Sequence, residues 1–262
     1  MFGVVPKALW DRLNPADEHN RIKLSLSCLL IKTPRHTVLV DTGIGADLKD
    51  RFCDLYRIER DAGLLRGLGE LGVMPDDIDF VINTHLHFDH CGGNTVKQGD
   101  TYIPVFKRAQ YVIQEREWYD ANHPNERTKA SYLEQHFAPI EKAGQLMLVD
   151  GDHEVVRGIT VKCTNGHTRG HQSVLIEANG MKAMYLGDLI PTTSHIKIPY
   201  IMGYDLYPLD IIAKKKEILD MAARENWLLI FEHDPKVSFG YVSEKEGKKV
   251  FRRVEDENRA PG

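Results

Sequence analysis

The stretch that decides the fold is Thr84-His85-Leu86-His87-Phe88-Asp89-His90, which directly follows the apolar run 78–83. Three imidazoles and one carboxylate within six residues form a ligand set that suits borderline divalent metals such as zinc. A strand that ends in a tight loop can turn the first two histidines toward one ion, and the aspartate and last histidine toward a second ion. Two ions about 3.5–4 Å apart can share a water and polarise a carbonyl together. The stretch therefore predicts a dinuclear metal site.

Three later side chains each follow an apolar run of their own. His167 lies in the glycine-flanked segment 165–171, while Asp188 and His233 each come directly after a run that reads as a buried strand. A single histidine at the end of a strand is more often structural than functional. Together with the first stretch, however, the three side chains provide the donors that two ions require.

Hydrophobic periodicity predicts runs of strands with helices outside them. The expected strands span residues 22–31, 37–40, 78–83, 109–113, 145–149, 155–163, 172–177, 182–186 and 227–231. The expected helices span residues 62–71 and 209–225. This order favours an α/β fold with two sheets packed face to face and flanked by helices over a doubly wound parallel sheet. No linker divides the chain, so we expect a single hydrolase domain over residues 1–262.

The motifs T-H-L-H-F-D-H, G-H-T-R-G-H, L-G-D and F-E-H resemble the signature of the metallo-β-lactamase superfamily, and Asp41-Thr42-Gly43 resembles its early D-T-G turn. The resemblance covers essentially the whole chain and implies a four-layer αβ/βα sandwich. The ligands that it implies are His85, His87 and His167 for one ion, Asp89, His90 and His233 for the other, and Asp188 as a bridge. It also implies that Asp41 and His171 orient these ligands. The implied cofactor is a pair of divalent ions, for which zinc is favoured and manganese, iron or cobalt are alternatives.

Within the superfamily, the chain is most similar to the quorum-quenching N-acyl-homoserine-lactone lactonases. The similarity rests on Met1-Phe2-Gly3-Val4-Val5-Pro6-Lys7, on His123-Pro124-Asn125 and on Tyr204-Asp205-Leu206-Tyr207-Pro208. It implies that a metal-bridging hydroxide attacks the lactone carbonyl, and that Asp89 passes a proton to the leaving alkoxide. Asp188 and Asp89 are then the catalytic carboxylates.

Several other functions remain open at this point. A glyoxalase II-like thioesterase shares the ligand set, as do other ester and phosphotriester hydrolases of the fold. A mononuclear iron oxygenase of the persulfide dioxygenase type is a further alternative, and a non-catalytic scaffold is disfavoured because all seven ligand positions are filled. True β-lactamases usually carry a cysteine at the position of Asp188, which disfavours antibiotic hydrolysis.

Two features depart from the lactonase pattern. The best-known lactonases place a substrate-contacting tyrosine three residues after the bridging aspartate, where this chain has Pro191. His195, Tyr200 or Tyr204 in the following loop could replace it, although packing under the loop is the favoured explanation for the two tyrosines and an exposed loop position is the favoured one for His195. Relatives also have a strand before the opening heptapeptide, so we expect either a truncated start or a first sheet that lacks one strand.

The composition describes an ordinary globular protein, with 42% hydrophobic and 27% charged residues and a net charge of −4. Neither a nucleic-acid nor a membrane partner is expected, and the partner is a small-molecule substrate. The N-terminus lacks the pattern of a signal peptide, so we expect a cytoplasmic protein. A homodimer is suggested by analogy alone. Cys91, which directly follows the histidine stretch, is expected to pack under the loop rather than act as a nucleophile.

Overall fold

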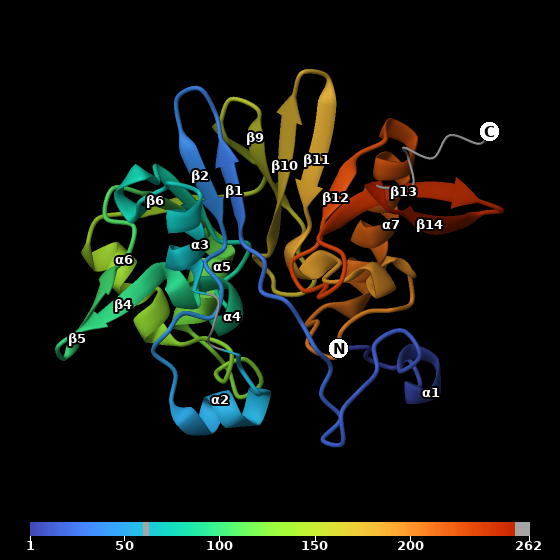
Figure 1. The fold of residues 1–262 in the computed structure, drawn as a ribbon, viewed down its shortest axis with the longest axis horizontal. Coiled ribbons are helices and arrows are strands. Elements are labelled where there is room, and N and C mark those ends of the chain that lie inside the picture. The colour runs from blue at the N-terminus through green and yellow to red at the C-terminus, as the bar shows by residue number, and fades with distance from the viewer. Residues whose placement is uncertain (60–62, 255–262) are drawn as a thin grey trace. The chain divides into compact units, whose positions relative to one another are not determined.

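Two runs of strands build the two larger β-sheets of the described residues (Figure 1). Each of these sheets contributes to a hydrophobic core of its own. The computed structural model describes residues 1–59 and 63–254. The chain divides into two units. We call residues 28–150 the central unit, and residues 1–27 together with 151–254 the flanking unit. Of the helices described, none is both long and apolar enough to cross a membrane.

The central unit contains a five-stranded sheet in the order β1-β2-β3-β6-β7. Its strands are β1 (Leu29–Lys32), β2 (Thr37–Val40), β3 (Phe80–Ile82), β6 (Gln110–Gln114) and β7 (Leu146–Val149). β1 and β2 are antiparallel, whereas β2, β3, β6 and β7 run parallel to one another. Parallel neighbours end at the same edge of the sheet, which is where open α/β sheets place their ligands. The residues that follow β2 and β3 therefore lie side by side.

Short helices and one hairpin complete the central unit. The helices are α2 (Asp50–Tyr56), α3 (Leu64–Glu70), α4 (Phe88–Cys91), α5 (Glu115–Asn122) and α6 (Ala138–Lys142), with the 3₁₀ turns η1 (Pro75–Asp77), η2 (Gly92–Asn94) and η3 (Glu134–His136). The hairpin pairs β4 (Thr95–Gln98) with β5 (Thr101–Pro104). Leu68 of α3, Ala121 of α5 and Ile140 of α6 are buried in the core with Leu39 of β2.

The flanking unit contains a seven-stranded sheet in the order β14-β13-β12-β11-β10-β9-β8. Its strands are β8 (His153–Val156), β9 (Ile159–Cys163), β10 (Gln172–Ala178), β11 (Met181–Tyr185), β12 (Leu228–Ile230), β13 (Phe239–Lys245) and β14 (Lys248–Arg252). All neighbours are antiparallel except β11 and β12, which are parallel. β11 and β12 therefore end at one edge of the sheet, and candidate ligands follow both of them.

The main helix of the flanking unit is α7 (Pro208–Glu225), and the shorter elements are α1 (Lys7–Trp10), η4 (Gly187–Leu189) and η5 (Thr193–Ile196). Pro208 opens α7, where its missing N–H leaves no helical bond unmade. Asn226 ends the helix in the left-handed conformation, with φ 55°. The buried side chains of α7 recur at helical spacing: Ile211, Lys215, Ile218, Leu219 and Ala222.

The fold class predicted from the sequence is confirmed, and most expected strands are present within the described residues. Both expected helices are present as well, although residue 62 of the first one lies outside the described residues. Two expectations about strands were wrong. The expected strand 155–163 is a hairpin, because Gly158 adopts φ 81° and turns the chain between β8 and β9. Of the expected strand 22–31, only β1 is a strand. The backbone N–H groups of Ser25 and Ser27 instead bond to the carbonyls of His233 and Glu232.

Candidate metal centre

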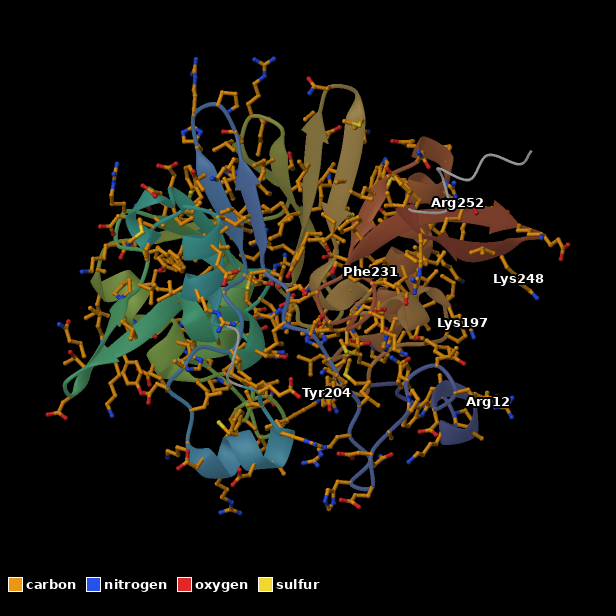
Figure 2. All side chains as sticks on the ribbon, in the orientation of Figure 1. Arg12, Lys197, Tyr204, Phe231, Lys248 and Arg252 are labelled. Carbon is orange, nitrogen blue, oxygen red and sulfur yellow. The ribbon has the colours of Figure 1, made fainter. Side chains whose placement is uncertain are left out.

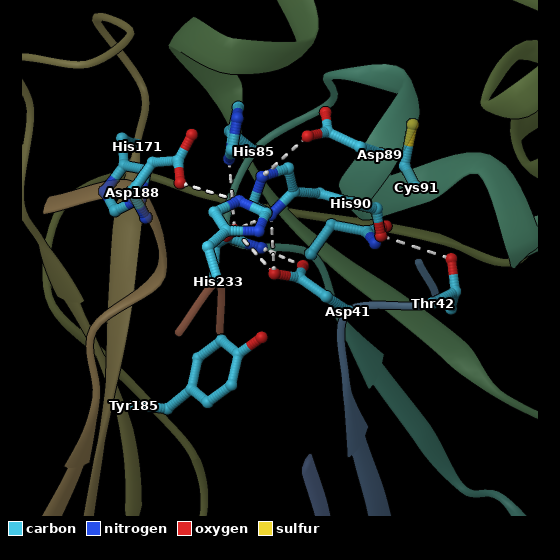
Figure 3. A network of polar contacts seen from close by, with 12 residues as sticks. Asp41, Thr42, His85, Asp89, His90, Cys91, His171, Tyr185, Asp188 and His233 are labelled. Carbon is cyan, nitrogen blue, oxygen red and sulfur yellow. Dashed lines mark hydrogen bonds and ion pairs between the residues drawn. The ribbon is translucent and has the colours of Figure 1, made fainter. Parts of the chain in front are cut away.

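The first group of candidate ligands lies in the central unit, where β2 and β3 end. We call it the His85 cluster, and it comprises Asp41, His85, His87, Asp89 and His90. Figure 3 labels all of these residues except His87. The imidazole centroids of His85 and His90 are 4.0 Å apart, and those of His85 and His87 are 4.4 Å apart. Asp89 Oδ2 lies 3.9 Å from His90 Nε2. The structure thus brings together all the candidate ligands that the sequence places in this unit.

Asp41 fixes which nitrogen of His90 carries the proton. Its carboxylate accepts the N–H and the hydroxyl of Thr84, each at 2.7 Å, and faces His90 Nδ1 at 3.1 Å. A carboxylate only accepts, so His90 donates through Nδ1 and carries its lone pair on Nε2. Thr84 has already donated its hydroxyl proton to Asp41. His85 Nδ1, 3.1 Å from that hydroxyl, therefore donates to it, and His85 also carries its lone pair on Nε2.

A buried carboxylate that the sequence analysis missed holds the loop between β3 and α4. Glu117 of α5 is fully buried, and its Oε1 accepts the N–H of Leu86 at 2.9 Å and the hydroxyl of Tyr132 at 3.0 Å. Burial and the Glu117 charge raise the pKa of Tyr132, so this phenol remains a hydrogen-bond donor. Because Leu86 separates His85 from His87, Glu117 fixes the backbone between two candidate ligands.

The second group lies in the flanking unit. We call it the Asp188 cluster, and it comprises His167, His171, Asp188, Asp205 and His233. Asp188 follows β11 within η4, His233 follows β12, and all five side chains are buried. His167 Nε2 lies 3.0 Å from Asp188 Oδ2, and His233 Nε2 lies 3.0 Å from Asp188 Oδ1. One carboxylate therefore faces two imidazoles, one through each oxygen (Figure 3 shows Asp188 and His233).

Both of these imidazoles are held through the opposite nitrogen. His167 Nδ1 lies 2.9 Å from Asp205 Oδ1, and the other oxygen of Asp205 accepts the N–H of Met202 at 2.8 Å. His233 Nδ1 lies 2.8 Å from the carbonyl oxygen of Ser25, which can only accept. His167 and His233 consequently donate through Nδ1, and each directs its Nε2 atom toward Asp188. Asp205 and Ser25 have no assigned role in the sequence analysis.

This arrangement around Asp188 requires a cation. An Nε2 lone pair and a carboxylate oxygen are both acceptors, and two acceptors 3.0 Å apart repel each other unless a proton or a metal ion lies close to both. Imidazole Nε2 atoms and carboxylate oxygens are also the donor set that zinc and related divalent ions prefer. The residues present therefore fit a divalent metal.

His171 and Cys91 are buried and are already bonded. His171 Nε2 accepts the backbone N–H of Asp188 at 3.0 Å, and its Nδ1 bonds to the hydroxyl of Thr164 at 2.8 Å. The ring thus contacts the backbone of a candidate ligand. Cys91 Sγ lies 3.3 Å from the carbonyl of Leu86, and burial raises the pKa of its thiol, which leaves it a poor nucleophile.

The three residues considered as substrate contacts have different surroundings in the flanking unit. His195 is buried, with Nδ1 bonded to Thr192 Oγ1 at 2.8 Å and Nε2 bonded to the carbonyl of Met1 at 3.0 Å. Burial lowers the pKa of His195 to about 3. Tyr200 is also buried, whereas Tyr204 is 59% exposed (Figure 2). Of the three, Tyr204 has the surface needed to contact a ligand, and its role there stays a prediction.

Residues 23–233 match the sequence profile of the metallo-beta-lactamase superfamily, and this range includes every candidate ligand of both clusters. The chain belongs to the metallo-β-lactamase superfamily. This confirms the resemblance inferred from the histidine motifs.

Named relatives within the superfamily are similar over most of their length. The chain is 28% identical over 246 residues to an N-acyl homoserine lactonase of Bacillus cereus, covering 88% of this chain and 87% of the relative. It is 31% identical to a probable metal-dependent hydrolase of Staphylococcus aureus, with a TM-score of 0.89 and coverage of 97% and 91%. An N-acyl homoserine lactone hydrolase, solved with N-hexanoyl-L-homoserine at its catalytic metal centre, is 25% identical with a TM-score of 0.65 and coverage of 81% and 82%.

These findings confirm the predicted enzyme class, a metal-dependent hydrolase of the metallo-β-lactamase superfamily. They also support a small-molecule substrate.

Proposed function

We propose that this protein is a dinuclear metal-dependent hydrolase that opens lactone esters, with N-acyl homoserine lactones as its substrate class. The observation that carries the proposal is the shared orientation of four buried histidines. His85, His90, His167 and His233 each donate through Nδ1 to an acceptor in their own unit, so each can bind a metal ion through Nε2. The lactonase relatives support the choice of substrate.

In the proposed site, both clusters serve one hydrolase domain that spans residues 1–262. The proposed ligands are His85, His87 and His167 for one ion, Asp89, His90 and His233 for the other, and Asp188 as the bridge. The two oxygens of Asp188 face two imidazoles within the flanking unit, which supports a bridging role. Zinc is favoured by the nitrogen and oxygen donors, and manganese, iron and cobalt are compatible with them.

Two bound divalent ions would supply an activated water and a Lewis acid for the lactone carbonyl. Hydrolysis then forms one bond from the water oxygen to the carbonyl carbon and breaks the ring ester bond, so one proton must move to the leaving alkoxide. Asp89 is the proposed carrier of this proton, because its side chain is 26% exposed and lies next to His90. Asp41 and His171 keep their neighbours in place during this transfer.

An aromatic cluster next to the His85 cluster supports a substrate with an apolar portion. Phe88 lies between His87 and Asp89 in sequence. Its ring centroid is 4.8 Å from that of Phe52 and 5.7 Å from that of Tyr56. Tyr56 is 50% exposed and its neighbour Leu55 is 65% exposed. Apolar walls with a few polar groups are typical of small-molecule sites. These rings are the proposed contact for the acyl chain.

Parallel assays on N-hexanoyl homoserine lactone and on S-lactoylglutathione test the substrate class. We expect turnover of the lactone by zinc-loaded protein and little turnover of the thioester. Turnover of the thioester alone would favour a glyoxalase II-like enzyme, and oxygen consumption with one iron per chain would favour a persulfide dioxygenase. Either result would reject the proposal.

The variant Asp188→Asn tests the bridging role. An amide cannot neutralise two cations, so we expect loss of lactone hydrolysis and of one bound zinc. The control is Asp77→Asn, which changes an exposed carboxylate of η1 that bonds to the N–H of Met74. Undiminished turnover by the Asp188 variant would contradict the proposed mechanism.

A further inference from the structure

Three consecutive lysines of α7, Lys214, Lys215 and Lys216, have very different surroundings. In sequence they are a charge run of the kind that usually faces solvent. The helical period, however, places Lys215 on the buried face, four residues after Ile211 and three before Ile218. Lys215 is completely buried, whereas Lys216 is exposed. A lysine in the core requires partners for its charge.

The partners of Lys215 are backbone carbonyls of one segment. Its ammonium donates to the carbonyl of Tyr200 at 2.7 Å, of Lys197 at 3.1 Å and of Ile198 at 3.3 Å. An ammonium has three N–H donors, so all three are used by this segment. Burial lowers the pKa of Lys215 to about 7, and the charge of Asp205 opposes that shift. Lys215 thus joins α7 to the backbone segment that follows η5. This segment begins at Lys197, which is labelled in Figure 2.

The same segment contacts His167 at its other end. Asp205 Oδ1 accepts from His167 Nδ1, and the N–H of Leu206 bonds to the carbonyl of His167 at 3.1 Å. We call residues 197–206 the clamp loop. One end of the clamp loop is fixed by Lys215, and the other end holds both the imidazole and the backbone of His167. Displacement of the first end would therefore change the orientation of His167.

We propose that Lys215 is a positioning residue for His167. Its ammonium fixes the clamp loop, so that Asp205 holds His167 with Nε2 directed at Asp188. An apolar side chain at position 215 would fill the core but would remove the ammonium from three carbonyls, of which that of Lys197 would keep the N–H of Tyr200 as a donor. The consequence for metal binding rests on the proposed function, in which His167 is a ligand, whereas the consequence for the order of the clamp loop does not.

The test compares Lys215→Met with Lys216→Met, which removes a neighbouring exposed ammonium from the same helix. Zinc affinity is measured for both full-length proteins by competition with a chromophoric chelator. We expect Lys215→Met to bind one zinc about tenfold more weakly, the lower end of the effect of losing an outer partner of a ligand. Lys216→Met should match the unmodified protein. Equal zinc affinity in the two variants would overturn the proposal.

A double variant shows whether Lys215 acts through Asp205. Asp205→Asn alone should weaken the same zinc step by about 10–100-fold. If both residues act on His167 through the clamp loop, adding Lys215→Met should weaken binding little further. Fully additive losses would show that Lys215 acts by another route and would overturn the proposal.

Hydrogen exchange of the metal-free proteins separates this inference from the proposed function. We expect amides of the clamp loop to lose protection in Lys215→Met and to keep it in Lys216→Met, even if the unmodified protein binds no zinc. Equal protection would overturn the proposal.

If Lys215→Met fails to fold, Lys215→Gln replaces it, because a glutamine amide offers two N–H donors in place of the three of the ammonium. Clamp-loop protection in Lys215→Gln should then fall below that in Lys216→Gln, which makes the same change at an exposed position of the same helix. Equal protection in these two variants would overturn the proposal.

Discussion

Asp41→Asn tests how strongly the contacts at Nδ1 control metal binding. Asp41 has φ 55°, a left-handed conformation that asparagine also adopts readily, so the backbone should not change. The aspartate accepts three hydrogen bonds, two from Thr84 and one from His90. An asparagine oxygen can take over the N–H of Thr84, but its NH₂ group would face two donors. His90 would then move its proton to Nε2 and lose the lone pair proposed to bind metal.

The size of the effect follows from these bonds. Each hydrogen bond to a charged group contributes about 1.5–3 kcal/mol, so losing two should lower the free energy of unfolding of the metal-free protein by about 3–6 kcal/mol. Loss of an outer partner weakens metal binding about 10–100-fold, equivalent to about 1.4–2.7 kcal/mol. Only one of the two zinc steps should change, because His90 is a proposed ligand of one ion.

Chelator competition resolves the two zinc steps, and urea unfolding of the metal-free protein gives the stability. Asp77→Asn is the matched control, because it makes the same chemical change at an exposed carboxylate of η1. We expect the control to resemble the unmodified protein in both measurements. If Asp41→Asn bound two zinc ions with unchanged affinity, the idea that Nδ1 contacts select the metal-binding tautomer would be refuted.

Three further predictions concern stability and substrate preference. Burial lowers the pKa of Lys215 to about 7, so above this pH the unfolded state binds more protons than the folded state. Relative to Lys215→Met, the unmodified protein should therefore gain about 2 kcal/mol in free energy of unfolding between about pH 7 and about pH 9. Parallel pH profiles of the two proteins in urea unfolding would contradict this. Burial lowers the pKa of His136 to about 4, so the free energy of unfolding should fall by about 3 kcal/mol as the pH drops from about 6.5 to about 4. The variant His136→Gln should lose less stability over the same pH range. An identical loss in the two proteins would exclude this histidine as the cause. If the ring of Phe52 contacts the acyl chain, Phe52→Ala should raise KM about tenfold for long-chain lactones and little for short-chain lactones. Equal changes in KM for both substrates would argue against this contact.

The local motifs of the sequence were enough to predict the fold class and to choose residues that the structure groups together in each unit. His85, His87, Asp89 and His90 are close in sequence, and the strand before them fixes where they emerge. Asp188 and His233 could be selected because each follows an apolar run, and these runs are the parallel neighbours β11 and β12. Residues that follow adjacent parallel strands emerge at the same edge of the sheet, so their proximity does not depend on the conformation of the connecting loops.

The acceptors behind the histidines could not be predicted in the same way. His233 is held by the carbonyl of Ser25, a group that every residue possesses, from a segment 208 residues away. Asp205 lies in a loop and Glu117 lies in α5, and their contacts depend on how those segments fold back on the candidate ligands. Lys215 lies within a run of three lysines, and only the register of α7 shows that its side chain is buried.

The β13–β14 hairpin shows a signal that was present but not used. Glu246 and Gly247 both have positive φ, at 51° and 71°, and join two strands paired from Lys245 and Lys248. This is the geometry of a two-residue hairpin turn, and alternating side chains flank it on both sides. The strands expected from the sequence end at residue 231, so this hairpin was not predicted.

The most direct test of the dinuclear centre is the anomalous scattering of zinc in crystals of the metal-loaded protein. We expect two peaks about 3.5–4 Å apart, with Asp188 contacting both and with His85, His90, His167 and His233 bound through Nε2. A single peak, peaks remote from Asp188, or ligation through Nδ1 would contradict the proposed mechanism.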